Sequence, residues 1–408
     1  MHILFLTDNF PPEVNAPATR THEHCREWVK AGHTVTVVTC APNFPKGMVF
    51  DGYRNLPFQR EEMDGISVIR VWSYITANEG FLKRVLDYTS FMATAMLVAP
   101  FIRNVDVIVG TSPQFFTAVA AFAVGAVKHT PYVFEVRDLW PGSIRAVGAM
   151  KHGKVLDALE ALELFLYRRA AAVVSVTHSF KDDLVARGID ADKIDVITNG
   201  VDGQRFQPRA KDPVLERELG LQGKFVAGYI GTHGMAHALE TILEAAEILA
   251  THPTGQDIRF IFLGEGARKD ALKARAESKG LRNVVFLDSV GRAEVARYWS
   301  LLDVSIIHLK KDPVFETVIP SKLFECMGMG IPVLHGVAGE SARIVEGDGV
   351  GLVFPPEDTA ALVAGLLRLQ GDRTLLSGFR TRGPVAAKQY DRTALASRML
   401  TVLEGLTH

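Results

Sequence analysis

The segment Pro320-Ser321-Lys322-Leu323-Phe324-Glu325 carries the residues of this sequence best suited to binding a charged substrate. Ser321 is a typical helix N-cap, which would place Lys322 and Glu325 in the first turn of a helix. Exposed helix amides beside a lysine suit a phosphate or diphosphate, and Glu325 can accept hydrogen bonds from ribose hydroxyls. A structural interpretation stands beside this one, because a glutamate at a helix start also stabilises the helix dipole without any ligand.

Two glycine-rich turns follow apolar runs in the same half of the chain. The first is Gly231-Thr232-His233-Gly234, and the second contains Gly264 in Leu263-Gly264-Glu265-Gly266. Small residues at such turns let backbone N–H groups approach an anion at the start of the next helix. The glycines can also serve chain geometry alone.

The first half of the chain offers a similar loop at Asp8–Ala18, which contains Asn15 and Ala16. It follows an apolar run and precedes a helical pattern, so its backbone can meet an anionic ligand. It lacks the G-x-G-x-x-G pattern of a dinucleotide site. The alternative interpretation is a stiff proline turn.

Arg137 and Asp138 follow the apolar run Tyr132–Glu135, where a strand should end. Arg137 can hold an anion, and Asp138 can accept a hydrogen bond from a hydroxyl. A buried Arg–Asp pair is also a common structural motif, and both interpretations stay open.

We expect no metal and no bound cofactor. No His/Asp/Glu cluster has metal-ligand spacing, and Asp190-Ala191-Asp192 lies in a charged turn that we interpret as a solvated loop. The sequence also lacks the motifs of a serine hydrolase and of a P-loop kinase.

The composition excludes several classes of protein. The chain has 408 residues, with 45 Lys+Arg against 46 Asp+Glu, which gives no overall field to attract nucleic acid. With 48% hydrophobic residues it is too apolar for a disordered protein. Its 3 cysteines form no C-x-x-C pair, which indicates a reducing compartment.

Short apolar runs alternate with helical patterns along the whole chain, which predicts an α/β fold with doubly wound, mostly parallel sheets. The expected strands are residues 3–6, 35–39, 66–71, 107–109, 132–135, 173–176 and 196–197, and then 225–230, 258–263, 284–287, 304–307, 332–334 and 352–354.

The pattern restarts after a polar, turn-rich segment at residues 199–213. We therefore expect two Rossmann-like domains, at residues 1–200 and 201–385, facing a central cleft. A last helical segment, 386–408, is expected to return to the first domain. Ligands of such sheets bind at the carboxyl ends of the strands, which is where the loops above lie.

Residues 81–103 are rich in Phe, Leu and Met and have cations at both ends. They predict either core helices or a peripheral contact with an anionic membrane surface. The amino terminus has no signal-peptide pattern, and no apolar stretch is long enough to span a membrane. We expect a cytoplasmic protein, with association at the inner face of the cytoplasmic membrane as one alternative.

Several motifs together resemble the family 4 (group 1) retaining glycosyltransferases of the GT-B class. They are Phe10-Pro11-Pro12-Glu13, Gly32-His33-Thr34-Val35, Asn199-Gly200-Val201-Asp202, Leu263-Gly264-Glu265-Gly266 and Pro320-Ser321-Lys322-Leu323-Phe324-Glu325. Within this family, Asn15-Ala16-Pro17-Ala18-Thr19-Arg20 and Arg137-Asp138-Leu139-Trp140-Pro141 resemble bacterial O-antigen and capsule transferases of N-acetyl-L-fucosamine.

The resemblance implies a glycosyltransferase that moves a sugar from a nucleotide-sugar to a saccharide acceptor in O-antigen or capsular polysaccharide biosynthesis. The donor would be a UDP-N-acetyl-amino sugar such as UDP-L-FucNAc, and the acceptor would be linked to a polyprenyl diphosphate or soluble. The implied donor-binding residues are Asn15, Ala16, Gly231, Thr232, His233, Gly264, Ser321, Lys322 and Glu325, and the implied catalytic residues are Arg137, Asp138 and Glu316.

The sequence departs from the family pattern at one position. The family usually has two glutamates separated by seven residues, but Thr317 stands eight residues before Glu325 and Glu316 lies one residue earlier. Two other functions stay open. One is a UDP-sugar 2-epimerase of the same two-domain fold, and the other is a two-domain protein that binds a ligand without reaction.

Overall fold

The computed structural model describes residues 1–44, 46–76, 81–139, 153–291 and 293–407, with the backbone alone for residues 81 and 82. Two compact units make up the chain: Met1–Thr198 with Arg392–His408, and Asn199–Asp391. The tail of the first unit thus starts at Arg392 rather than at residue 386, because α14 (Arg373–Ala387) and η5 (Lys388–Tyr390) belong to the second unit.

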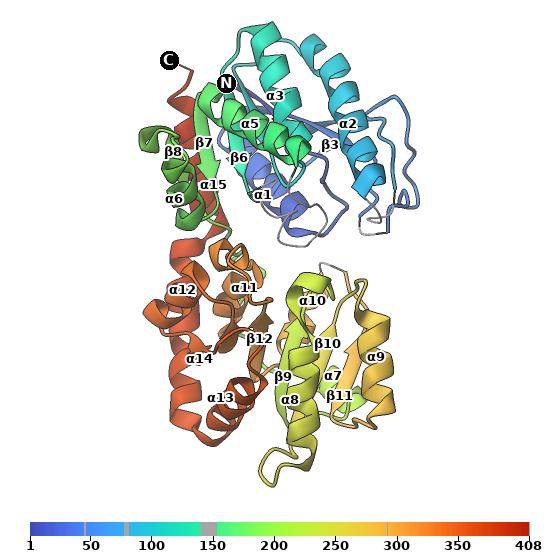
Figure 1. The fold of residues 1–408 in the computed structure, drawn as a ribbon, viewed down its shortest axis with the longest axis vertical. Helices are drawn as coiled ribbons and strands as arrows, with labels where there is room; N and C mark the ends of the chain where they lie inside the picture. Colours follow the sequence, from blue (N-terminus) through green and yellow to red (C-terminus); the bar gives the residue numbers. More distant parts are fainter. Residues whose placement is uncertain (45, 77–80, 140–152, 292, 408) are drawn as a thin grey trace. The chain divides into compact units, whose positions relative to one another are not determined.

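The first unit contains an eight-stranded sheet in the order β3-β4-β2-β1-β5-β6-β7-β8 (Figure 1). Its strands are β1 His2–Leu6, β2 Thr34–Cys40, β3 Phe58–Met63, β4 Ile66–Val71, β5 Val107–Thr111, β6 Tyr132–Val136, β7 Ala172–Ser175 and β8 Ile194–Val196. Its helices are α1 Ala16–Lys30, α2 Phe81–Val98, α3 Phe115–Lys128, α5 Lys154–Arg169, α6 His178–Ala186 and α15 Arg392–Glu404, with short 3₁₀ turns η1 Ala99–Phe101 and η2 Ala191–Lys193.

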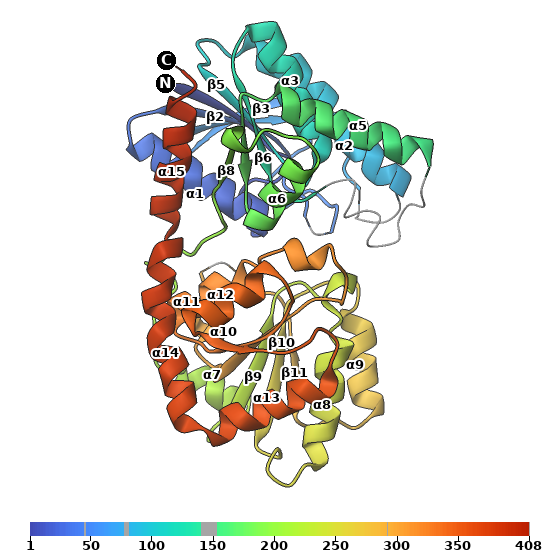
Figure 2. The ribbon, with the colours of Figure 1, turned by 60° about the vertical axis from the view of Figure 1, so that its left-hand side comes forward.

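Helices cover both faces of this sheet, which explains why its strands are continuously apolar. Alternate residues of β1 enter different cores: Leu4 and Leu6 pack with α2, α3 and α5, whereas Ile3 and Phe5 pack with α1 and α15. The helices α1 and α15 lie side by side (Figure 2), and the indole N–H of Trp28 donates to the carbonyl of Ala396 at 2.9 Å.

The second unit contains a six-stranded parallel sheet in the order β11-β10-β9-β12-β13-β14. Its strands are β9 Phe225–Ile230, β10 Ile258–Leu263, β11 Val284–Leu287, β12 Val304–His308, β13 Val333–Gly336 and β14 Gly351–Val353. Besides α14 and η5, its helical elements are α7 Pro213–Glu218, η3 Met235–His237, α8 Glu240–Thr251, α9 Lys269–Ser278, α10 Val295–Trp299, η4 Phe315–Thr317, α11 Lys322–Met329, α12 Glu340–Asp348 and α13 Thr359–Gly371. The prediction of two doubly wound, mostly parallel sheets is confirmed.

One strand was not predicted. β3 is charged, lies at the sheet edge, and pairs antiparallel with β4. The hairpin turns at Asp64 and Gly65, both with positive φ (51° and 79°). Asp-Gly is the usual sequence of this turn, so that dipeptide was the available signal.

Within the segment 81–103, α2 and η1 together have two different faces. Phe91, Ala95 and Ala99 are buried in the core, whereas Leu97 and Phe101 are 70% and 83% exposed. Core packing therefore explains one face only. Among the described helices, none is both long enough and apolar enough to cross a membrane.

Candidate functional site

The order of strands places a ligand site between β9 and β12. The chain runs outward from β9 to β10 and β11 on one side, and from β12 to β13 and β14 on the other. Such a reversal leaves a crevice at the carboxyl ends of the two central strands, where doubly wound proteins bind ligands. The loop after β9 and the start of α11 both belong to this edge.

Lys322, the first residue of α11, lies against the end of β9. Its Nζ is 3.8 Å from the centroid of the Tyr229 ring, and a Cβ placed on Gly231 would lie 2.7 Å from the same Nζ. The Nζ is enclosed and has no hydrogen-bond partner. Burial lowers the pKa of Lys322 from its usual 10.5 to about 8. An enclosed cation without an acceptor is suited to an incoming anion.

The two glycine-rich turns form one hydrogen-bonded pair. The N–H of Gly231 donates to the carbonyl of Leu263 at 2.9 Å, and the N–H of His233 donates to that of Glu265 at 2.8 Å. A Cβ on Gly264 would lie only 1.9 Å from the carbonyl oxygen of Gly231. Gly264 therefore has a geometric role, since it allows the two turns to meet.

His233 is fully buried beneath these turns, and neither ring nitrogen has a hydrogen-bond partner. Burial lowers the pKa of His233 to about 4, helped by the charges of Lys269 and Lys322. The imidazole is therefore neutral at physiological pH. Thr232 is exposed, and its carbonyl accepts a hydrogen bond from the Tyr229 hydroxyl at 2.9 Å.

The helix predicted after Pro320 is α11, and its position is confirmed. Ser321 is the N-cap residue, as predicted, but its backbone is helical and its side chain makes no capping hydrogen bond. Instead, the N–H groups of Leu323 and Phe324 donate to the carbonyls of Pro320 and Ser321. Glu325 lies half-buried in the first turn, and its charge favours the protonated form of Lys322.

Glu316 and Thr317 lie in η4, at the same edge of the second sheet. Glu316 is exposed, and a Cβ on Gly339 would lie 1.9 Å from its carbonyl oxygen, so the loop before α12 packs against it. The Thr317 hydroxyl donates to the carbonyl of Val314 at 2.6 Å. Thr317 thus has a local structural partner where the family pattern has its first glutamate.

In the first unit, Asn15 and Ala16 start α1 beside the reversal between β1 and β5. The Asn15 Oδ1 accepts the N–H of Ala18 at 2.9 Å, and its Nδ2 donates to Asn9 Oδ1 at 2.5 Å. Asn15 is therefore a true N-cap. The helix starts at Ala16, because this cap satisfies its first turn.

Arg137 and Asp138 follow β6, as predicted. Both of their backbone N–H groups donate to the Ser112 hydroxyl, at 2.7 and 3.2 Å. The Nε and Nη1 of Arg137 are enclosed without a partner, and burial lowers the pKa of Arg137 to about 10. Trp140 and Pro141 of the same motif lie outside the described residues.

Sequence reasoning missed three residues that organise these sites. Tyr229 meets Lys322, Ser112 fixes Arg137, and Arg20 forms a buried ion pair with Glu135 at 2.8 Å. Tyr229 lies in an apolar strand whose sequence predicts only a buried core position, so no local pattern indicates its contact with Lys322. A charged residue on the buried stripe of α1 was the available signal for Arg20.

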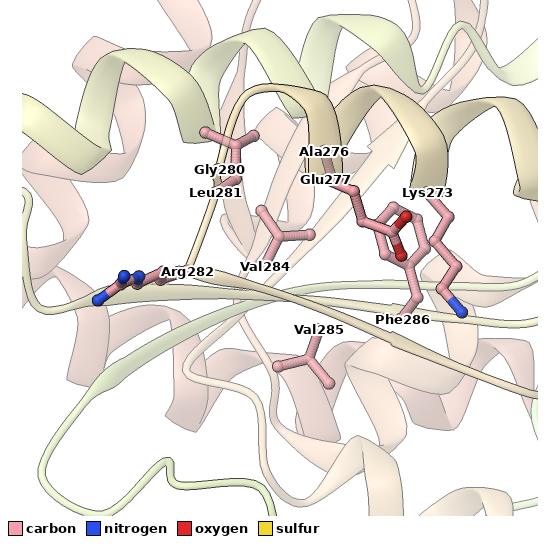
Figure 3. Close-up of a pocket in the computed structure, with 9 residues that line it drawn as sticks. All are labelled: Lys273, Ala276, Glu277, Gly280, Leu281, Arg282, Val284, Val285 and Phe286. Atoms are coloured by element: carbon pink, nitrogen blue, oxygen red, sulfur yellow. The ribbon is translucent and has the colours of Figure 1, made fainter.

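Two other features are separate from these sites. Asp190 caps η2 and Asp192 lies in it, both exposed, and the described residues contain no group of His, Cys, Asp and Glu that could hold a metal. A cavity of about 490 Å³ lies between α9 and β11, where Lys273 and Glu277 project beside Phe286 (Figure 3). None of the predicted site residues lines this cavity, and β11 is an edge strand.

Comparisons with known proteins agree with this geometry. A model of the glycosyl transferase 4-like domain matches residues 15–200, and a model of the glycosyl transferases group 1 matches residues 224–372. The putative colanic acid biosynthesis glycosyl transferase WcaI of Escherichia coli K12 is 27% identical over 378 residues, which is 90% of this chain and 91% of the relative.

Solved structures show the same fold. Sucrose-phosphate synthase from Thermosynechococcus elongatus has a TM-score of 0.75 at 16% identity, over 99% of this chain and 98% of that chain. Anabaena HepE, solved in complex with UDP and glucose, has a TM-score of 0.73 at 17% identity, over 99% of both chains. The two family models together match most of the chain, including the residues around Lys322, so the chain belongs to the group 1 glycosyltransferases and is an enzyme of the glycosyl-transfer class with a GT-B fold.

Proposed function

We propose that this enzyme transfers a sugar from a UDP-sugar to a saccharide acceptor in the biosynthesis of a bacterial surface polysaccharide. The observation that carries the proposal is Lys322, an enclosed ammonium without an acceptor at the strand reversal of the second sheet. A diphosphate would supply the missing acceptor. The colanic acid relative and the UDP complex of HepE support the polysaccharide and the uridine nucleotide.

The chemistry we propose for Lys322 is stabilisation of the leaving group. Cleavage of the bond between the sugar and the diphosphate leaves negative charge on the departing UDP. The ammonium of Lys322, at the positive end of the α11 dipole, would bind that charge most strongly once the bond breaks. Since the chain supplies this positive charge, we propose that transfer needs no metal ion.

The finer donor proposal is a UDP-N-acetyl-amino sugar such as UDP-L-FucNAc, with a polyprenyl-diphosphate-linked acceptor. It is supported by the resemblance of the Asn15–Arg20 and Arg137–Pro141 motifs to N-acetyl-L-fucosamine transferases. We also propose that the first unit touches an anionic membrane surface, because exposed Leu97 and Phe101 are accompanied by the exposed cations Lys83 and Arg103.

The test is a panel of UDP-, GDP- and dTDP-sugars incubated with polyprenyl-diphosphate-linked saccharides and read by mass spectrometry, with and without EDTA. We expect transfer from a UDP-sugar that survives EDTA. Transfer from GDP-sugars alone, or transfer that EDTA abolishes, would contradict the donor or the metal proposal. A Lys322→Ala enzyme that folds and transfers at the wild-type rate would refute the role of Lys322.

A further inference from the structure

A second enclosed cation lies in the first unit, at the carboxyl end of β6. The Nε and Nη1 of Arg137 are enclosed and have no hydrogen-bond partner. Arg137 also makes no ion pair with any residue that the structure describes. An unpaired guanidinium at such a place is costly, and proteins keep one where an anion compensates it.

Two carboxylates of the first unit are paired with arginines other than Arg137. Arg20 pairs with Glu135 at 2.8 Å and also donates to two backbone carbonyls, and Arg392 pairs with Glu23. The charges of Glu135, Arg20 and Arg392 all act on Arg137. Glu135 and Glu23 are therefore each paired with an arginine other than Arg137.

The backbone around Arg137 is held in place. The Ser112 hydroxyl, at the carboxyl end of β5, accepts the N–H groups of Arg137 and Asp138. Ser112 also donates its own N–H to the carbonyl of Glu135 at 3.0 Å. The guanidinium is thus presented from a fixed main chain at the ligand-binding edge of the sheet, next to the reversal between β1 and β5.

We propose that Arg137 forms an oxyanion site in the first unit, which holds a phosphate or carboxylate group of a substrate. A guanidinium whose Nε and Nη1 have no partner can donate charge-assisted hydrogen bonds to either group. The identity of the substrate that carries the anion rests on the proposed function. A diphosphate-linked acceptor and a uronic acid in the acceptor are its two sources.

The experiment measures thermal unfolding of the full chain in inorganic phosphate and, separately, in glucuronate. A Lys322→Met background removes the cation of the second unit. We expect phosphate or glucuronate to raise the unfolding temperature of this variant, and we expect Lys322→Met/Arg137→Met to need at least tenfold more anion for the same rise. Lys322→Met/Arg103→Met is the matched control, because Arg103 is an exposed arginine of the same unit. Stabilisation by phosphate alone or by glucuronate alone supports the site and identifies its anion.

Equal anion responses of the Arg137 and Arg103 variants would overturn the proposal, whatever the enzyme transfers. If Arg137→Met does not fold, Arg137→Gln makes the same comparison. Activity measurements then separate the anion site at Arg137 from the proposed transfer function. With Lys322 intact, Arg137→Lys should partly restore the acceptor KM that Arg137→Met raises. If the wild-type enzyme transfers no sugar, the proposed function is refuted, but the anion response of Arg137 still stands.

Discussion

The ammonium of Lys322 lies 3.8 Å from the centre of the Tyr229 ring and has no hydrogen-bond partner among the described residues. The same tyrosine donates its hydroxyl to the carbonyl of Thr232 at 2.9 Å. One side chain therefore holds both the cation and the loop that we expect to meet a diphosphate. A cation–π contact only partly replaces lost hydration, so the ammonium remains available to an anion.

Replacement of Lys322 by methionine should stabilise the protein while it abolishes UDP binding. Methionine fills similar volume without a buried charge. Because one pKa unit corresponds to 1.36 kcal/mol, relief of the lowered pKa of Lys322 should raise the free energy of unfolding at pH 7 by about 1 to 3 kcal/mol. Urea unfolding and calorimetric titration with UDP measure the two effects. Lys310→Met, at an exposed lysine of the same unit, should change neither; a destabilised Lys322→Met protein would contradict the argument.

The affinity for UDP should fall as the pH rises above about 8. The pKa of Lys322 is about 8 in the free protein, so the ammonium is present below that pH and is lost above it. Binding at higher pH must then include uptake of a proton, which costs up to tenfold in affinity per pH unit. His233, with its pKa at about 4, stays neutral throughout this range. Titrations at pH 7 to 9.5 test this prediction, since the phosphates of UDP keep their charge in that range. A UDP affinity that does not change up to pH 9.5 would contradict it.

The same pKa makes a prediction for stability. An unfolded lysine has a pKa of about 10.4, so the unfolded chain holds the Lys322 proton more firmly than the folded chain does. The loss of folding stability caused by the buried charge of Lys322 is complete below pH 8 and fades as the pH rises toward about 10.4. Wild-type stability relative to Lys322→Met should therefore improve across this window, as urea unfolding at a series of pH values can show.

Tyr229 should matter to UDP binding through its ring more than through its hydroxyl. Tyr229→Phe keeps the face under Lys322 and loses the hydrogen bond to Thr232, so we expect a loss of affinity of only a few-fold. Tyr229→Leu removes the face, and the midpoint of the pH profile should then fall by about 0.5 to 1 unit, because the ammonium loses its favourable contact. Calorimetric pH profiles of both variants make the comparison. Equal midpoints in the two variants would exclude the aromatic contact as a positioning device.

Local patterns were enough to predict the strands that form the two sheets, because doubly covered strands are continuously apolar. They also located α11, where a polar residue precedes the start of an amphipathic turn. They failed at β3, whose charged residues lie on a sheet edge and need no apolar side chains. The sequence signal for such an edge strand lies in the hairpin turn that follows it, and here that turn is an Asp-Gly pair.

The site could be predicted only where a residue type carries its own chemistry. Lys322 and Arg137 stand out in any sequence, but their lack of partners depends on tertiary packing. The geometric role of Gly264 depends on the approach of two turns whose hydrogen-bonded residues, Gly231 and Leu263, are 32 residues apart along the chain. Contacts between distant segments leave no local pattern.

Membrane contact by the first unit should depend on two exposed side chains. Leu97 and Phe101 are 70% and 83% exposed, and insertion of each should contribute about 1 to 2 kcal/mol. The double variant Leu97→Ser/Phe101→Ser should therefore reduce sedimentation with anionic liposomes at least tenfold, and Lys83→Glu/Arg84→Glu should weaken it in a salt-dependent manner. Val214→Ser/Val385→Ser is the matched control in the second unit, where both valines are exposed. Unchanged sedimentation of the first two variants would remove the membrane proposal.

Gly231 and Gly234 stand in the same loop and give a matched pair of alanine substitutions. Gly231 has φ of 143°, a conformation that is costly for any other residue, and its added Cβ would meet the Nζ of Lys322 at 2.7 Å. At Gly234 φ is ordinary, and the nearest atom to an added Cβ is the His237 ring at 3.4 Å. Gly231→Ala should cost about 1 to 3 kcal/mol of stability from strain and should weaken UDP binding at least tenfold, because Lys322 must move. Gly234→Ala should change the free energy of unfolding by less than about 0.5 kcal/mol. Urea unfolding and UDP titration of both variants decide the matter. If Gly231→Ala loses stability but keeps full UDP affinity, the position of Lys322 beside this loop has no bearing on the diphosphate, and the donor site must be sought elsewhere on the second sheet.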